Sequence, residues 1–87
     1  MSHEVVVTST ARRDLQRIPP RIVPAIIEFA FGDLASSPRR AGKPLQRELE
    51  GLFGARRGPY RILYSIDDAN RVDILRIDHR SDVYRSD

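Results

Sequence analysis

The chain has 87 residues, a formal net charge of +3 at pH 7 and no cysteine. This length suits one domain, expected over residues 1–87, and is too short for two. The lack of cysteine excludes disulfides, thiol nucleophiles and thiolate metal ligands. No apolar run reaches the roughly 18 residues that a membrane helix needs, and the N-terminal residues lack the basic leader and long apolar stretch of a signal peptide. We therefore expect a cytoplasmic protein with no membrane partner.

Positive charge is concentrated in one part of the chain. Between Ser37 and Ile62, seven cations stand against two carboxylates, a net charge of +5, whereas the remaining residues together carry −2. Fourteen of the fifteen cations are arginine, a side chain that can hold a phosphate through two parallel hydrogen bonds. A basic half of this kind favours a polyanionic partner, with nucleic acid first. A bias in genomic base composition would enrich arginine equally well.

The N-terminal residues predict a strand followed by a short helix. His3–Thr8 contains three consecutive valines between polar residues, which is typical of a strand. Apolar residues then recur at i, i+4 and i+7, namely Ala11, Leu15 and Ile18, and this spacing indicates one face of a helix. We expect the helix to end before Pro19.

A second helix is predicted directly afterwards, because apolar residues continue at helical spacing from Ile22 to Leu34. Proline is tolerated in a helix only in the first turn, where its missing N–H has no partner to lose. Pro24 therefore indicates a start near Arg21 or Ile22. The helix should end by Ser36–Pro38, so that the two helices form a hairpin.

The C-terminal half predicts a basic loop and three strands. Arg39–Leu52 is polar and should pass as a loop into a strand. The strand-like stretches are Phe53–Arg57, Tyr60–Asp67 and Val72–His79, joined by turns short enough for hairpins. Alternation along the last two strands is not clean, so the sequence leaves open which face packs on the helices. The expected fold class is α+β, in the order β-α-α-β-β-β, with two N-terminal helices on one face of a twisted antiparallel sheet.

Several kinds of active site are excluded by the residue pattern. No Asp, Glu or His group has metal-ligand spacing, so we expect neither a metal site nor a bound cofactor. Gly51, Gly54 and Gly58 match no phosphate-binding loop. No serine lies in a nucleophile elbow.

Two segments near the C-terminus combine arginine, tyrosine and histidine: GLFGARRGPYR at Gly51–Arg61 and DHRSDVYR at Asp78–Arg85. They resemble the GLWRxRVGDYRIIY and GHRRDVYR signatures of the RelE/ParE toxin superfamily. The upstream segments TARRDLQRIP and SPRRAGKPLQRELEGLFG are also similar to that family, in particular to its RelG-like branch. The resemblance covers essentially the whole chain in the right order.

The resemblance implies a microbial ribonuclease fold with RNA bound on the sheet face opposite the helices. RelE-type members cleave messenger RNA in the ribosomal A site, by attack of a ribose 2′-OH on the adjacent phosphate and without a metal. The products carry a 2′,3′-cyclic or 3′-phosphate and a 5′-OH. ParE-type members inhibit DNA gyrase instead. Both kinds are normally held by a small cognate antitoxin that folds over the basic surface as it binds.

The resemblance also implies roles for single residues. Arg61 matches the arginine that contacts the scissile phosphate, and Arg80 matches the one that stabilises charge or protonates the leaving oxygen. Tyr84 matches the tyrosine that stacks on a base, and Arg56 matches a cationic position of the preceding strand. Two positions depart from the pattern: Gly54 stands where a second cation is common, and Asp78 replaces the usual glycine.

The physical requirement agrees with these roles, because transesterification places extra negative charge on phosphorus and fixed cations can stabilise it. Arginine holds its proton too tightly to act as a base, whereas histidine is the side chain that ordinarily titrates near neutrality. His79 is therefore the candidate base or acid. Simple alternation along the last strand, however, places it on the face opposite Arg80. Additional RNA-binding cations are expected at Arg57, Lys43, Arg39 and Arg40.

Other interpretations stay open at this point. Arg61 and Arg80 suit solvated strand positions or partners of nearby aspartates, and Tyr60 and Tyr64 suit the core. Three functions compete: a ribosome-dependent endoribonuclease, a ParE-like gyrase inhibitor without nuclease activity, and an inactive homologue that only binds an antitoxin. The presence of Arg56, Arg61, Arg80 and Tyr84 in one chain favours the ribonuclease.

Overall fold

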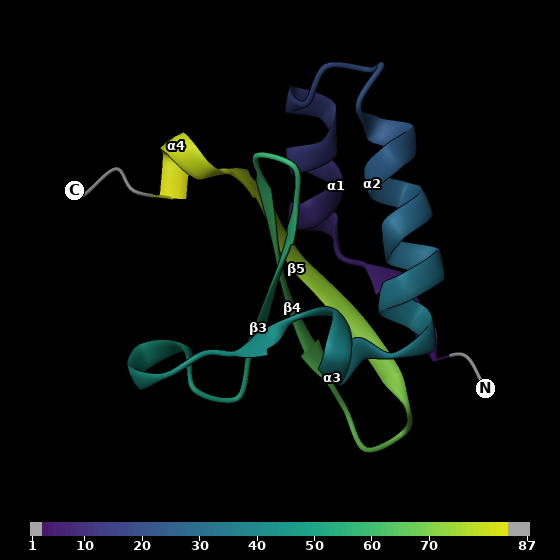
Figure 1. The fold of residues 1–87 in the computed structure, drawn as a ribbon, viewed down its shortest axis with the longest axis vertical. Coiled ribbons are helices and arrows are strands. Elements are labelled where there is room, and N and C mark those ends of the chain that lie inside the picture. Colours follow the sequence, from purple (N-terminus) through teal and green to yellow (C-terminus); the bar gives the residue numbers. More distant parts are fainter. Residues whose placement is uncertain (1–2, 84–87) are drawn as a thin grey trace.

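The computed structural model describes residues 3–83. In chain order its elements are β1 (Glu4–Val7), α1 (Ser9–Arg17), α2 (Val23–Phe29), the π-helical turn η1 (Ala30–Leu34), α3 (Pro38–Ala41), β2 (Lys43–Pro44), the 3-10 turn η2 (Arg47–Leu49), β3 (Phe53–Arg57), β4 (Tyr60–Ile66), β5 (Arg71–His79) and α4 (Arg80–Val83). The α+β class is confirmed. Figure 1 shows α1 and α2 on one side of the strands, with α4 and the 45–52 loop on the other. Across the described residues, no helix is long and apolar enough to cross a membrane.

The five strands form one sheet in the order β1-β5-β4-β3-β2. The antiparallel arrangement that we expected holds from β2 to β5, but β1 runs parallel to β5, with Glu4 opposite Arg71 and Val7 opposite Ile74. A parallel pair needs a long crossover connection, and the helices after β1 provide part of it. The expectation of a plain loop over 39–52 was also wrong, because α3, β2 and η2 lie there.

Both predicted helices are confirmed, and local contacts explain their starts. The Thr8 hydroxyl oxygen accepts a hydrogen bond from the Ala11 N–H at 3.3 Å, which caps α1. The same hydroxyl donates to the Ile74 carbonyl of β5 at 2.7 Å, so the cap also fixes α1 on the sheet. Pro24 lies in the first turn of α2, where its missing N–H has no consequence.

A β-bulge in β5 settles which face of the last strands packs on the helices. Leu63 of β4 pairs with Arg76, yet the next residue, Tyr64, pairs with Ile74, so Leu75 is the extra residue. The buried side chains accordingly change spacing from two to three residues, through Val72, Ile74 and Ile77. Beyond the bulge, Ile77 and His79 share the core side, whereas Arg76 and Asp78 share the outer face.

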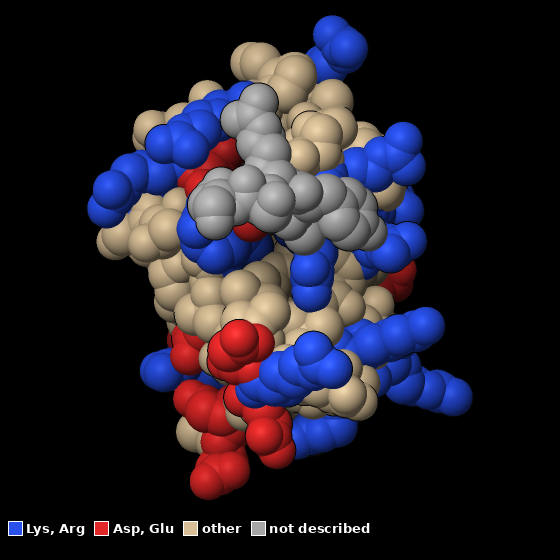
Figure 2. All heavy atoms as spheres, turned by 90° about the vertical axis from the view of Figure 1, so that its left-hand side faces the viewer, with Lys and Arg blue, Asp and Glu red and all other residues tan. Residues whose placement is uncertain are grey.

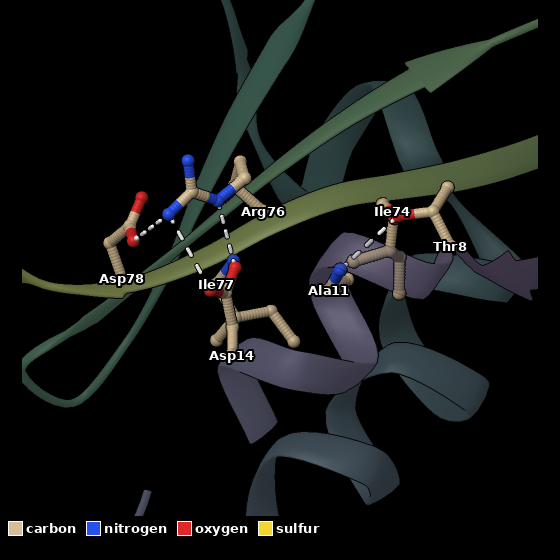
Figure 3. A network of polar contacts seen from close by, with 7 residues as sticks. All are labelled: Thr8, Ala11, Asp14, Ile74, Arg76, Ile77 and Asp78. Carbon is tan, nitrogen blue, oxygen red and sulfur yellow. Dashed lines mark hydrogen bonds and ion pairs between the residues drawn. The ribbon is translucent and has the colours of Figure 1, made fainter. Parts of the chain in front are cut away.

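A buried carboxylate joins α1 to the edge of β5. Pairing with β1 ends at Ile74, and beyond it the Ile77 N–H donates to Asp14 Oδ2 at 2.9 Å (Figure 3). Asp14 is 5% exposed. The Arg76 guanidinium donates to Asp14 at 2.9 Å and to Asp78 at 3.2 Å. The hydrogen bond to Asp14 and the charge of Asp78 raise the pKa of Arg76 above its ordinary value. This network fixes the C-terminal end of β5.

The core lies between the helices and the inner face of the sheet, and Tyr64 is its largest fully buried side chain. Its hydroxyl donates to the Pro38 carbonyl oxygen, and its ring stacks on Phe53 with centroids 5.6 Å apart. Gly42 is required beside it, because a β-carbon there would lie 2.6 Å from the Gly54 carbonyl oxygen. This contact brings the chain at β2 close against β3.

Candidate nucleic-acid interface

The outer face of the sheet, turned away from the helices, holds an open groove of about 500 Å³. Strand alternation explains its composition: Ala55 and Ile62 point into the core, so the neighbouring Arg56 and Arg61 point outward. Strands β2 to β4, the 58–59 turn and the start of α4 contribute its lining, which consists of Lys43, Leu45, Gly54, Arg56, Gly58, Pro59, Tyr60, Arg61, Arg80 and Ser81. Four of these residues are cationic.

The cations of the groove lie together on neighbouring strands. Arg56 and Arg61 are directly opposite each other on β3 and β4, an arrangement that destabilises a sheet when the charges are alike. Among the described residues, every ion pair is made by Arg71 or Arg76, and none involves a groove cation. Figure 2 views the side where α4 and the 45–52 loop lie, and shows Lys and Arg side chains on both sides of this face, with a group of Asp and Glu side chains at its lower left. The groove therefore suits a polyanion.

The absence of a side chain at Gly54 leaves room for the Arg61 guanidinium. A β-carbon at residue 54 would be 3.1 Å from Arg61 Nε and 3.4 Å from its Nη2. The guanidinium thus lies across the space that a side chain at 54 would need. The position that often carries a second cation in the family pattern is consequently covered here by the charge of Arg61.

The end of β5 brings Arg80 into the groove. Its backbone N–H donates to the Pro59 carbonyl at 2.7 Å, which holds the start of α4 against the β3–β4 turn. Arg80 itself is exposed and lines the groove. Arg56, Arg61 and Arg80, which come from different parts of the sequence, therefore line one groove.

His79, the candidate base, is not part of the groove lining. Its ring makes an edge-to-face contact with Tyr60, with centroids 5.2 Å apart, and its Nδ1 lies 2.8 Å from the Ser81 hydroxyl. The bulge of β5 lies at Leu75, upstream of His79, so His79 and Asp78 still point to opposite faces of the strand. His79 therefore lies beside the groove, in contact with two of its lining residues, Tyr60 and Ser81, but does not line it.

The other predicted RNA-binding residues divide between the groove and other surfaces. Lys43 lines the groove. Arg57 points to the helix side, where its guanidinium carbon lies 5.9 Å from the centroid of the Phe29 ring. Arg39 and Arg40 are exposed on α3 and are not in the groove lining. Tyr84 lies outside the described residues.

Six of the ten residues that line the groove were not predicted as site residues: Leu45, Gly54, Gly58, Pro59, Tyr60 and Ser81. Tyr60 is only 7% exposed and was expected in the core. Tyr60 adjoins Arg61 in the Gly51–Arg61 segment, which was the available signal; nothing in the pattern pointed to Leu45.

Within the described residues, no group of three or more His, Asp or Glu side chains could hold a metal ion.

Comparison with known proteins places this arrangement in a family. Residues 5–84 match the family model described as the ParE toxin of type II toxin–antitoxin systems. The chain is similar to Toxin RelG of Mycobacterium tuberculosis, with 62% identity over 86 residues that cover 98% of this chain and 99% of the relative. It is also similar to Toxin RelE of the same organism, with 54% identity over 84 residues that cover 95% of this chain and 87% of the relative.

A solved structure supports the fold at comparable identity. The crystal structure of the toxin–antitoxin complex RelBE2 from Mycobacterium tuberculosis contains a chain that is 60% identical. It superposes with a TM-score of 0.88 over 92% of this chain and 100% of that chain. The sheet and helices that build the groove are therefore shared with that protein.

Proposed function

The chain belongs to the ParE toxin family of type II toxin–antitoxin systems, and we propose that it is a toxin of the RelE type that cleaves messenger RNA on the ribosome without a metal. The single observation that carries the proposal is the groove in which Lys43, Arg56, Arg61 and Arg80 meet without ion pairs among the described residues.

The proposed reaction is a transesterification. The 2′-oxygen of one nucleotide forms a bond to the adjacent phosphorus while the bond from phosphorus to the next 5′-oxygen breaks. The proton of the 2′-OH passes to a base or to solvent, and the leaving oxygen takes up a proton to become a 5′-OH. The transition state carries extra negative charge on phosphorus, and preorganised cations in a partly enclosed site stabilise that charge.

Arg61 is the proposed principal phosphate ligand, since its guanidinium lies at the groove floor across Gly54. Arg56 and Arg80 add charge from either side, and Lys43 adds a fourth cation. His79 is not proposed as the base, because it does not line the groove that holds the arginines. Tyr84 remains the proposed base-stacking residue; Tyr84→Phe should keep much of the activity and Tyr84→Ala should lose it.

Gyrase inhibition is the second candidate, because the matching family model carries the ParE name. The relatives with 62% and 54% identity are instead named RelG and RelE, which favours the ribonuclease. A cognate antitoxin is the proposed protein partner, and the RelBE2 structure is described as a toxin–antitoxin complex. The basic groove would suit an acidic antitoxin segment.

The test combines programmed ribosomes with variants matched in chemistry. The purified chain should cut ribosome-bound message, the products should carry 5′-OH ends, and brief chelation should leave cleavage intact while a sedimentation control shows whole ribosomes. Arg61→Ala and Arg80→Ala should each lower the rate by about 10²–10³. Arg57→Ala is the matched control, since Arg57 contacts Phe29 on the helix side, and should cleave near the wild-type rate.

Two results would contradict the proposal. One is inhibition of gyrase on supercoiled plasmid by a chain that leaves the message uncut. The other is an Arg61→Ala variant that folds, binds ribosomes and cleaves as fast as the wild type.

A further inference from the structure

A second, smaller hollow of about 210 Å³ adjoins the groove on the outer face of the sheet. Leu49 of η2, Arg61 and Leu63 of β4, and Asp78 of β5 line it. Arg61 lines both spaces, so a ligand whose phosphate meets Arg61 in the groove has its neighbouring atoms at the mouth of the hollow.

Two of the four residues that line the hollow, Leu49 and Leu63, are apolar and stay in contact with solvent. Leu63 belongs to the outer face of β4, opposite α1 and α2, and is only partly buried. Leu49 is 38% exposed, one of two large hydrophobic side chains in the described chain with this degree of exposure. Two leucines beside an arginine offer a surface against which a flat, weakly polar group can remove its ring faces from water.

Hydrogen bonds hold Leu49 in this position. The 45–52 loop is closed at its base by the Leu45 N–H, which donates to the Leu52 carbonyl at 2.9 Å. Within the loop, the Leu49 N–H donates to Gln46, and the Leu49 carbonyl accepts from Leu52. Arg47 adopts a positive φ of 61°, an uncommon conformation for a residue with a side chain. The loop therefore presents Leu49 on a folded turn.

Asp78 gives the hollow a charge opposite to that of the groove. It lies directly across from Arg61 in the strand register, and its Oδ1 accepts a hydrogen bond from Arg76 at 3.2 Å. A carboxylate repels phosphate, so its presence beside an RNA groove does not serve backbone binding. An ionised carboxylate accepts several hydrogen bonds on its two oxygens, which suits a base edge that carries N–H donors.

We propose that this hollow binds the base of a nucleotide next to the cleaved phosphate, and that Asp78 selects guanine and disfavours uracil. This inference rests on the proposed ribonuclease function. Guanine presents two adjacent donors, N1–H and the 2-amino group, to the two oxygens of a carboxylate. Uracil presents a single N–H between two carbonyl oxygens, which the carboxylate repels. The leucines contact the ring faces, and Arg61 holds the phosphate.

The experiment uses ribosomes programmed with messages that differ only in the base on one side of the cut, and then on the other. At one of the two positions the wild-type chain should cleave guanine messages about 5- to 150-fold more efficiently than uracil messages, the range of discrimination for a good two-bond contact. Asp78→Asn should bring this ratio close to one. The ratio compares two substrates of the same protein, so partial unfolding of a variant does not move it.

Asp73→Asn is the matched control. Asp73 lies on the same strand and pairs with Arg71 at 3.1 Å, much as Asp78 pairs with Arg76, but it lines neither the groove nor the hollow. It should keep the full guanine preference. Leu49→Ser should raise KM several-fold for every message and leave the ratio unchanged.

A second set of messages, with a 2′-deoxy nucleotide at the cut, cannot be cleaved and reports binding alone. Equal binding and cleavage of guanine and uracil messages by the wild type would overturn the inference, as would a guanine preference that survives Asp78→Asn. A guanine preference in binding without cleavage of any ribose message would retain the hollow and overturn the proposed ribonuclease function.

Discussion

Replacing Asp14 by alanine should lower the free energy of unfolding by about 1–3 kcal/mol, chiefly because it leaves a buried backbone N–H without a partner. The carboxylate is 5% exposed and accepts the Ile77 N–H at 2.9 Å (Figure 3). Here β1 no longer pairs with β5. Without Asp14, no other described side chain hydrogen-bonds to that N–H.

The magnitude follows from the separate contacts. An unsatisfied buried N–H costs about 1–3 kcal/mol. The ion pair to Arg76 adds only about 0–1 kcal/mol, because the arginine side chain is 44% exposed and solvent screens it. Alanine recovers about 0.5 kcal/mol through its higher helix propensity. Asp14→Asn keeps an oxygen for the Ile77 N–H and should cost about half as much as the alanine variant.

Urea unfolding followed by circular dichroism measures the difference. With a slope of about 1 kcal/mol per M for a small domain, the midpoint should fall by about 1–3 M for alanine. Two results would refute the reasoning. If asparagine shifts the midpoint as far as alanine, charge rather than backbone capping dominates. If alanine shifts it by less than about 0.5 M, the N–H finds another partner.

Three further predictions follow from the same structure. Burial raises the pKa of the Tyr64 phenol from 10.0 to about 12. The stability that the neutral phenol contributes is therefore fully present below pH 10 and is lost as the pH rises toward 12. Over that range the wild type should lose about 2–3 kcal/mol more stability than Tyr64→Phe in parallel urea titrations. His79→Gln should give a single-turnover pH–rate profile that overlays the wild type, because His79 does not line the groove; loss of a limb near neutrality would restore it as the base. Gly54→Ala should keep the fold and lower cleavage by less than about tenfold, since its β-carbon would lie 3.1 Å from Arg61 Nε and push the guanidinium slightly aside; an unchanged rate would show that Arg61 acts from another position.

The helices and strands were predictable because their signals are local. The stretch Phe53–Arg57 was predicted with the bounds that β3 has, and the apolar spacing of the two helices follows from one buried face each. Pairing between β1 and β5 was not predictable in the same way, because it joins residues more than sixty positions apart and no short turn fixes its direction. The only local sign of the bulge at Leu75 is the irregular alternation of apolar residues along β5, which made the inner face of that strand ambiguous.

The site was predictable in its arginines and less so in its geometry. Arg56 and Arg57 are neighbours of equal charge, and only strand alternation separates them, with one in the groove and the other against Phe29. Asp14 looks like a surface residue of an amphipathic helix, yet it is buried, because α1 crosses the edge of β5 beyond the end of β1. A contact of this kind depends on tertiary packing and leaves no periodicity to detect.

The two departures from the family pattern, Gly54 and Asp78, both lie next to Arg61. Gly54 removes a side chain and lets the Arg61 guanidinium lie across β3. Asp78, opposite Arg61, adds a carboxylate where a glycine is usual. Because one position lacks a cation and the other carries a carboxylate, we expect this part of the groove to be less basic and to bind phosphate less tightly. We therefore expect contacts to a base to matter more in this chain, and the hollow between Leu49, Leu63 and Asp78 is where we propose that they form.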